Sequence, residues 1–247
     1  MDVIAANNEK TMVVRAILLV DQLVRSPRQL LERIRAEDRL AELARIMVLT
    51  ILIAGGAFGA AVGAWRGGSQ VLFAAVKMPL VILLTTCICA PVLTALTAAV
   101  GSPARMVRDL ALVLAALALG SVVLAAQAPL LLFARAARAP YHSTAILVFV
   151  CCLVAAIPAL MLLARGIGHL GQGAVLVFVG LVAMVLPVGA QMSWTLRPYL
   201  VRPRTLSVPF VRSVEGNLWD AVRQSTDSAR GIYHDRDDLA ASEKVVE

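Results

Sequence analysis

Residues 55–68 read GGAFGAAVGAWRGG, and this stretch decides the class of the fold. Gly55, Gly59, Gly63 and Gly67 recur at every fourth position, so they share one face of a helix. Glycine costs a water-exposed helix about 1 kcal/mol per site relative to alanine. In a lipid bilayer the same spacing is favourable, because helices there associate through close packing of their backbones. The stretch therefore predicts a membrane-spanning helix with a glycine face for helix packing.

The glycine face is open to more than one partner. We expect it to receive another helix of the same chain, since faces of small residues are common in membrane bundles. The alternative is a homo-oligomer, or a partner membrane protein that docks one of its own helices on this face.

The composition of the chain agrees with a membrane protein. Of its 247 residues, 60% are hydrophobic and 16% are charged, whereas soluble domains carry about 25% charged residues. The mean hydropathy is +0.81. Asp109 is the only acidic residue between positions 43 and 214, so this central region has too few charges for a surface in contact with water.

The formal net charge of +7 is distributed in a way that argues against a nucleic-acid partner. Residues 1–45 carry eight Lys or Arg against seven acids, and residues 197–247 carry eight against eight. Residues 46–196 carry seven against one, mostly in short connections, where basic residues anchor helices at lipid headgroups. No tail offers the basic face that nucleic-acid phosphates require, so we expect membrane lipids as partners.

Five apolar segments are long enough to cross a bilayer, which takes about 20 residues. We predict an all-α, polytopic transmembrane helix bundle of about five spans, at residues 46–65, 75–99, 110–133, 144–164 and 173–195. The second span is the least regular, because Pro79 and Pro91 could kink it or make it partly re-entrant. Four or six spans are the alternatives.

The N-terminal region, residues 1–45, is predicted to be cytoplasmic or interfacial and amphipathic. We expect a helix over residues 12–44 that runs into the first span, with Ser26 as N-cap and Pro27 at the first helical position of its second part. Its apolar residues recur at helical spacing among Arg and Glu. Such a helix either lies on the membrane or packs its apolar face on its own protein.

Residues 197–247 form a polar tail, which we expect to follow the membrane interface and to be disordered at its end. At its start, Trp194, Arg197 and Tyr199 combine aromatic and cationic side chains, which favour the membrane interface. We interpret this cluster as an interfacial anchor. The alternative is a lipid-headgroup or partner site. That site would be completed by Arg202, Arg204 and Trp219.

Three polar residues near or inside the predicted spans are candidates for function: Lys77, Gln127 and Gln191. A lysine in a span is costly and is a functional candidate by default. Lys77 lies within about one turn of the start of the second predicted span, so we expect it to reach the interface. An ion or substrate site is one alternative, and an interhelical bond to Gln127 or Asp109 is another. Both glutamines are expected to bond a neighbouring helix.

Motifs for catalysis or metal binding do not stand out in the sequence. The predicted spans hold no GxSxG, HExxH, Walker A or paired-carboxylate pattern. The four cysteines lie in apolar runs and the three histidines are scattered, which does not suit metal ligation. Asp109 is interpreted as a favourable charge at a helix start, beside Arg105 and Arg108. We therefore expect no enzyme activity, no cofactor and no metal.

We predict a multi-pass protein of the cell inner membrane. With five spans and a cytoplasmic N-terminus, the Lys and Arg residues outside the spans divide into 11 on each side, so the positive-inside rule favours neither orientation. The apolar stretch at residues 12–24 contains Arg15 and Asp21 and lacks a signal-peptide cleavage pattern. For this reason we expect the N-terminus to be cytoplasmic.

Two stretches carry a resemblance to a known group. Residues 57–86 read AFGAAVGAWRGGSQVLFAAVKMPLVILLTT, and residues 189–222 read GAQMSWTLRPYLVRPRTLSVPFVRSVEGNLWDAV. They resemble a bacterial group of small polytopic inner-membrane proteins, which is similar in layout to the Yip family, and the resemblance covers most of residues 27–225. It implies an N-terminal cytosolic region and about five spans, and it assigns no functional residue.

The same bacterial group is sometimes described as actin-binding, of the Wiskott-Aldrich homology type. That activity depends on a short amphipathic helix followed by a basic LKKT-like patch, which this chain lacks. The resemblance therefore implies no actin binding here.

These features predict a non-enzymatic integral membrane protein, a scaffold or accessory subunit that organises partner proteins or lipids. The alternative is a transporter or channel component, with Lys77, Gln127 and Gln191 lining a path. Coupled transport usually needs carboxylates inside spans or an inverted repeat, and neither is seen in the sequence. The two functions differ in whether the three polar side chains converge on one wet cavity.

Overall fold

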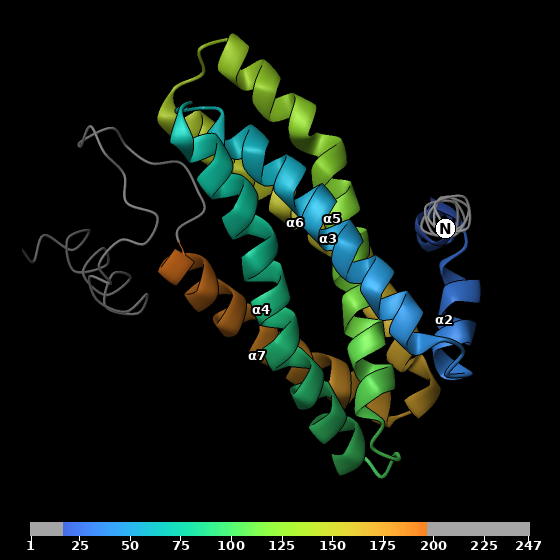
Figure 1. Cartoon of the computed structure of the whole chain (residues 1–247). Coiled ribbons are helices and arrows are strands. Elements are labelled where there is room, and N and C mark those ends of the chain that lie inside the picture. The colour runs from blue at the N-terminus through green and yellow to red at the C-terminus, as the bar shows by residue number, and fades with distance from the viewer. Residues whose placement is uncertain (1–16, 197–247) are drawn as a thin grey trace, which may run out of the picture. The chain divides into compact units, whose positions relative to one another are not determined.

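The computed structural model describes residues 17–196, without the side chains at 141–142 and 191–196. Every regular element in this range is a helix (Figure 1). The all-α fold class is therefore confirmed. The tail predicted for residues 197–247 lies outside the described residues, as does the start of the N-terminal region.

Five helices of the described range are long and apolar enough to cross a bilayer. They are α3 (Leu40–Gly63), α4 (Ser69–Ala99), α5 (Met106–Ala136), α6 (Tyr141–Ile167) and α7 (Gly173–Leu196). The chain is a multi-pass integral membrane protein, and the predicted five-span bundle is confirmed.

The second predicted span proves to be one unbroken helix. At 31 residues, α4 extends about 46 Å along its axis. Pro79 and Pro91 both lie inside it. A re-entrant course is therefore not adopted, because the helix runs from one end of the bundle to the other (Figure 1). It begins at Ser69, six residues earlier than the predicted start at residue 75.

The N-terminal region differs from the single helix expected over residues 12–44. Residues 17–25 are helical, α2 spans Pro27–Arg35, and a turn at residues 36–39 separates α2 from α3. Ser26 is the N-cap of α2 and Pro27 is in its first turn, as predicted, although the Ser26 side chain makes no capping bond. Proline has no N–H with which to continue the preceding helix. The second break lies where Glu37 and Arg39 adopt positive φ, at 56° and 48°.

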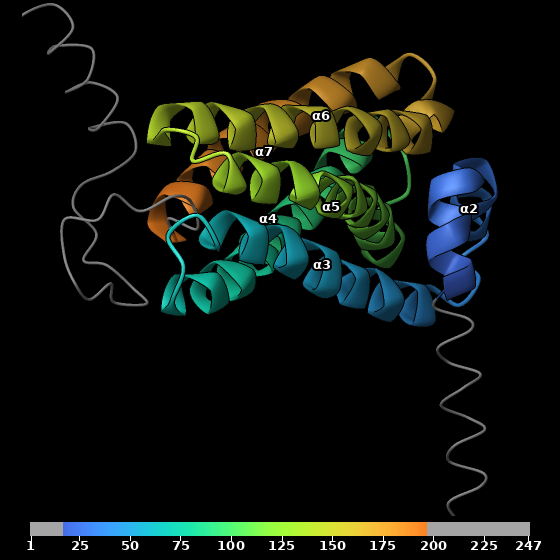
Figure 2. The ribbon, with the colours of Figure 1, turned by 90° about the horizontal axis from the view of Figure 1, so that it is seen from above.

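Helix α2 lies across one end of the bundle, at a steep angle to the spans (Figure 2). Its apolar side chains Leu30, Leu31 and Ile34 are buried in the same core as residues of α3 and α5. Of the two alternatives for this amphipathic region, α2 thus adopts the second, with its apolar face packed on its own protein.

The spans are covered to very different degrees. Helix α5 runs through the middle of the bundle, next to α3, α4 and α6 (Figure 2). In both α3 and α5, 61% of the residues in the most apolar stretch are buried, whereas in α7 only 11% of them are. Helix α7 packs mainly on α4 and has little contact with α6. One side of the bundle is therefore compact and the other is open.

The connection after α4 brings polar residues to the end that α2 covers. Gly101, with φ +81°, closes α4 in a Schellman arrangement: its N–H donates to the Ala98 carbonyl, and the Ser102 N–H donates to the Thr97 carbonyl. The chain then enters α5 at Met106. The C-terminus of α4 and the N-terminus of α5 are thus neighbours.

Candidate functional site

The glycine face packs against α4 of the same chain. A methyl group added to Gly59 would overlap the carbonyl group of Ala74, and one added to Gly63 would lie 2.5 Å from the Gln70 carbonyl oxygen. Both contacts are with backbone, which cannot rotate away as a side chain can. At Gly55 the nearest atoms lie at 3.5 Å, an ordinary van der Waals separation. Gly59 and Gly63 thus set the closest approach of α3 and α4.

Gly67 does not share the role of the other three glycines. It lies beyond the end of α3, adopts φ +81°, and has no atom within 4 Å of the position that a Cβ would take. Helix α3 ends at Gly63, so the four-residue spacing continues into the connection, where it no longer defines a helix face. Gly67 instead provides a backbone conformation that other residues rarely adopt.

Lys77 is buried, with only 6% of its surface exposed. We expected it to reach the interface from the first turn of its helix. Because α4 begins at Ser69, Lys77 is the ninth helical residue and lies about 12 Å along the axis. The expectation that Lys77 reaches the membrane interface stays a prediction.

Gln127 joins two spans. Its Nε2 lies 3.1 Å from the Val123 carbonyl oxygen of its own helix and 3.2 Å from the Cys151 carbonyl oxygen of α6, and the amide donates to both. This interhelical bond is the kind of contact expected from a glutamine in an apolar helix. Gln191 lies in α7, but its side chain is outside the described residues.

The predicted interfacial anchor falls almost wholly outside the described part of the chain. Trp194 belongs to the last turn of α7, without a described side chain. The remaining members lie beyond residue 196: Arg197, Tyr199, Arg202, Arg204 and Trp219.

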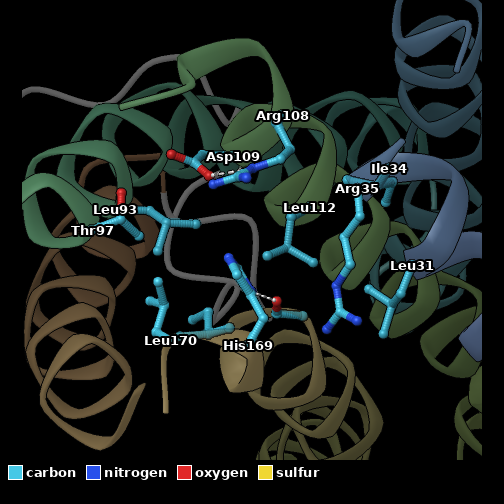
Figure 3. A pocket seen from close by; sticks show the side chains of 12 residues that line it. Leu31, Ile34, Arg35, Leu93, Thr97, Arg108, Asp109, Leu112, His169 and Leu170 are labelled. Atoms are coloured by element: carbon cyan, nitrogen blue, oxygen red, sulfur yellow. Dashed lines mark hydrogen bonds and ion pairs between the residues drawn. The ribbon is translucent and has the colours of Figure 1, made fainter. Parts of the chain in front are cut away.

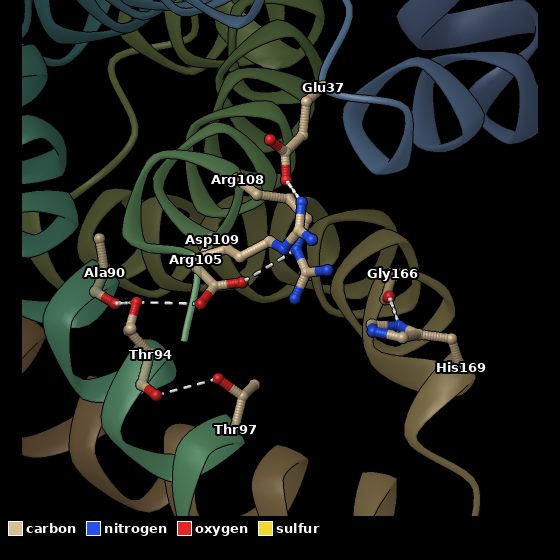
Figure 4. A network of polar contacts seen from close by, with 9 residues as sticks. All are labelled: Glu37, Ala90, Thr94, Thr97, Arg105, Arg108, Asp109, Gly166 and His169. Atoms are coloured by element: carbon tan, nitrogen blue, oxygen red, sulfur yellow. Dashed lines mark hydrogen bonds and ion pairs between the residues drawn. The ribbon is translucent and has the colours of Figure 1, made fainter. Parts of the chain in front are cut away.

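A polar network lies at the end of the bundle near α2 (Figure 4). Its centre is Asp109, which is 3% exposed in the first turn of α5. The Thr94 hydroxyl of α4 donates to Asp109 Oδ2 at 2.9 Å, and Arg108 Nε lies 3.6 Å from Asp109 Oδ1. The same hydroxyl lies 3.2 Å from the Ala90 carbonyl oxygen. The carboxylate thus bonds α5 to α4 in addition to lying at a helix N-terminus.

Further polar contacts tie the neighbouring elements together at this end. Arg105 forms an ion pair with Glu37 of the turn after α2. Arg35 Nη2 donates to the Arg165 carbonyl oxygen at 3.0 Å, and His169 Nδ1 lies 2.9 Å from the Gly166 carbonyl oxygen. These contacts fasten α2 to α5 and α6.

The sequence pointed to Asp109 as the single acid of the central region, but not to its partner. Thr94 is 15 residues away, on the preceding helix, and a threonine in an apolar helix can equally satisfy its hydroxyl on a carbonyl of its own helix. Arg35 and His169 were likewise not singled out. The sequence signal that could have indicated the Thr94–Asp109 pair is an acid at the start of a helix that follows, across a short turn, a helix carrying threonines.

A small cavity adjoins this network (Figure 3). Arg108 and Asp109 lie on one side of it and His169 on the opposite side, with Leu112 between them. Its volume is about 10 Å³, which is the space that one water molecule needs. The network can hold a water, and it has no room for an organic substrate.

A larger cavity lies deeper between α4, α5, α6 and α7. Its volume is about 170 Å³, and its lining comes from side chains that present only apolar surface. Thr85 belongs to the lining, but its hydroxyl donates to the Val81 carbonyl of its own helix at 2.8 Å. Neither Lys77 nor Gln127 lines this cavity or the smaller one.

The cysteines lie within the spans as free thiols. Cys89 and Cys151 are buried, Cys152 is half-buried and Cys87 is exposed. Within residues 17–196 no group of three or more His, Cys, Asp or Glu is placed to hold a metal ion.

Comparison of the chain with protein-family models, with curated proteins and with solved structures gave no significant match. The resemblance to the bacterial inner-membrane group and to the layout of the Yip family therefore stays a prediction.

Proposed function

We propose that this integral membrane protein is a non-enzymatic scaffold or accessory subunit of the cell inner membrane, which organises partner proteins or lipids. The observation that supports this most is the open side of the bundle. Within residues 17–196, only 11% of the most apolar window of α7 is buried, against 61% in both α3 and α5. Large apolar side chains are exposed along both α6 and α7, among them Phe149, Ile157, Val179 and Leu186.

The polar network supports a structural role for the charged residues. Asp109 and Arg35 bond neighbouring helices, and the adjoining cavity is the size of one water. A catalytic site needs a space in which a substrate meets the reacting groups. The charges at this end therefore serve to hold α2, α4, α5 and α6 in register.

The alternative, a transporter or channel component, would need Lys77, Gln127 and Gln191 to line one path. Gln127 instead donates to a carbonyl of α6, and the described cavities are lined by other residues. Burial of Lys77 is the observation that favours transport. A solute flux in proteoliposomes that Lys77→Leu abolishes, with assembly intact, would establish the transporter instead.

Purification in mild detergent followed by native mass spectrometry tests the scaffold proposal. We expect the full chain to retain a second protein, a second copy or bound lipid. A photo-crosslinking residue at Val179 of α7, which is 57% exposed, is expected to react with that partner. The matched position is Ile53 of α3, which is 65% exposed. Bare monomer with no retained component, and equal crosslinking at both positions, would contradict the proposal.

A further inference from the structure

The apolar cavity between α4 and α7 has a size and depth that suit one kind of occupant. Its lining includes Ala116 of α5, Ala156 and Ala159 of α6, and Val182 and Leu186 of α7. A volume of about 170 Å³ is close to the roughly 150 Å³ of engineered apolar cavities that stay dry and bind small hydrocarbons. Water is disfavoured there, and a helix is far too large.

The cavity lies inside the membrane, below the polar end of the bundle. Ala116 is eight residues after Arg108 on α5, which places it about 12 Å further along the helix axis. The hydrocarbon core of a bilayer is about 30 Å thick. The cavity is therefore at the depth of lipid acyl chains, on the side where α6 and α7 have little contact.

An empty space of this kind costs the lining its dispersion contacts, whereas a methylene chain restores them. Lipid tails surround the bundle and reach the gap between α6 and α7 without crossing water. A single acyl chain is the occupant that matches the apolar lining and is available from the surrounding lipid.

The surface above the cavity is cationic. Arg35, Arg105, Arg165 and His169 are exposed at this end. Acids lie at this end as well: Glu37 pairs with Arg105, Asp38 pairs with Arg33, Glu32 is exposed on α2, and Asp109 is buried and bonded to Thr94 and Arg108. The Arg35 guanidinium donates to the Arg165 backbone carbonyl oxygen. Neither the Arg35 nor the Arg165 guanidinium is paired with a carboxylate among the described residues. Such a surface attracts lipid phosphate.

We propose that the crevice between α4, α5, α6 and α7 binds one anionic phospholipid, with an acyl chain in the apolar cavity and the phosphate at Arg35 and Arg165 on the surface. The inference rests on the proposed function, because it names the lipid class that the bundle would organise. The phosphate stays outside the small polar cavity, which holds no more than one water.

The test uses the full chain in phosphatidylcholine liposomes. A trace of phosphatidylglycerol or phosphatidylcholine with a photoactivatable group in the middle of one acyl chain serves as the probe. After irradiation, mass spectrometry maps the adducts. We expect adducts at residues 156–163 and 181–186, and more of them from phosphatidylglycerol than from phosphatidylcholine. Adducts spread evenly over outward-facing residues of α6 and α7 would overturn the proposal, and so would equal labelling by both lipids.

Paired variants separate the chain site from the phosphate site. Ala156→Phe fills the cavity and should abolish cavity adducts, whereas Ile157→Phe adds the same ring to the neighbouring, 58% exposed position and should not. Arg165→Gln should lower the preference for phosphatidylglycerol about fivefold, the usual effect of one interfacial cation. Arg135→Gln, at the far end of α5, is its control.

The labelling pattern tests the lipid site and the purification experiment tests the scaffold, so one proposal can be wrong without the other. Retained lipid or protein in mild detergent, together with no adducts in the cavity, would overturn the lipid site and leave the scaffold proposal in place. Cavity adducts from a chain that purifies as bare monomer would contradict the scaffold and support the lipid site.

Discussion

The two sides of α4 are packed in opposite ways. Toward α3 the backbones almost touch, because Gly59 and Gly63 leave no side chain between the helices. Toward α5 and α7, aliphatic side chains and alanines leave a cavity of about 170 Å³. Only the contact with α3 brings backbone against backbone, whereas α7 approaches side chains of α4 and α5 bonds α4 through Thr94 and Asp109.

The difference shows what holds helices together when the solvent is itself apolar. Burying a leucine gains little there, since lipid tails are as apolar as leucine, and helices associate by close packing and by interhelical hydrogen bonds. The α3–α4 contact is closely packed, and Gln127 provides an interhelical hydrogen bond between α5 and α6. Helix α7 packs closely on α4, where Gly173 and Gly180 face Val100 and Leu96, but it has little contact with α6, and the bundle is open on that side.

The largest effect is expected at the glycine contact. Gly59→Leu should destabilise the protein by about 3 kcal/mol, because a side chain there overlaps backbone of α4 and forces the helices apart. Gly189→Leu makes the same change in α7 at a site with nothing within 4 Å, and should shift stability by less than about 1 kcal/mol. Thermal unfolding in detergent, followed by circular dichroism, measures both. Equal losses would show that α3 and α4 are not in close contact.

The polar end should be the next most sensitive. Thr94→Val removes the hydroxyl that donates to Asp109 and should cost about 2 kcal/mol, because a buried carboxylate loses a charge-assisted bond. The control is Thr97→Val, since the Thr97 hydroxyl donates to the Thr94 carbonyl of its own helix. The same unfolding assay applies. A neutral Thr94→Val would mean that Asp109 is satisfied without α4.

The spans were predictable because their signal is local. Each is an uninterrupted apolar run, and its length alone decides that it crosses a bilayer. The glycine spacing also predicted a packing face, since residues four apart share one side of a helix. Which helix covers that face depends on the arrangement of the whole bundle, and the sequence pattern left this open. Gly67 shows the limit of the pattern, because it continues past the helix end.

The site was less predictable, for physical reasons that differ from residue to residue. Lys77 lies deeper in its helix than predicted, because α4 begins six residues early, in a segment whose polar residues suggested a connection. Thr94 and Asp109 meet only once α4 and α5 turn back on each other. The apolar cavity depends on how branched side chains from four helices fit together, and no local pattern records that shape.

A smaller effect is expected where α5 meets α6. Gln127→Leu removes the bond to the Cys151 carbonyl and should cost about 1 kcal/mol, the usual range for an interhelical bond in a bilayer. Ser121→Ala is the control, because the Ser121 hydroxyl donates only within α5, to the Leu117 carbonyl. A crosslink between α5 and α6 whose yield falls in Gln127→Leu alone would locate the effect at this contact.

The smallest change in stability should come from filling the cavity. Ala156→Leu adds bulk to a lining position of α6, where the space of about 170 Å³ can receive it without moving backbone. The added methyl groups gain dispersion contacts but displace an acyl chain that would make similar ones, so the net change should stay below about 0.5 kcal/mol. Gly59→Leu adds a side chain to α3 that meets a carbonyl group on the opposite face of α4. A loss at Ala156 as large as that at Gly59 would mean that the two sides of α4 are equally close-packed in the membrane, and the contrast between them would disappear.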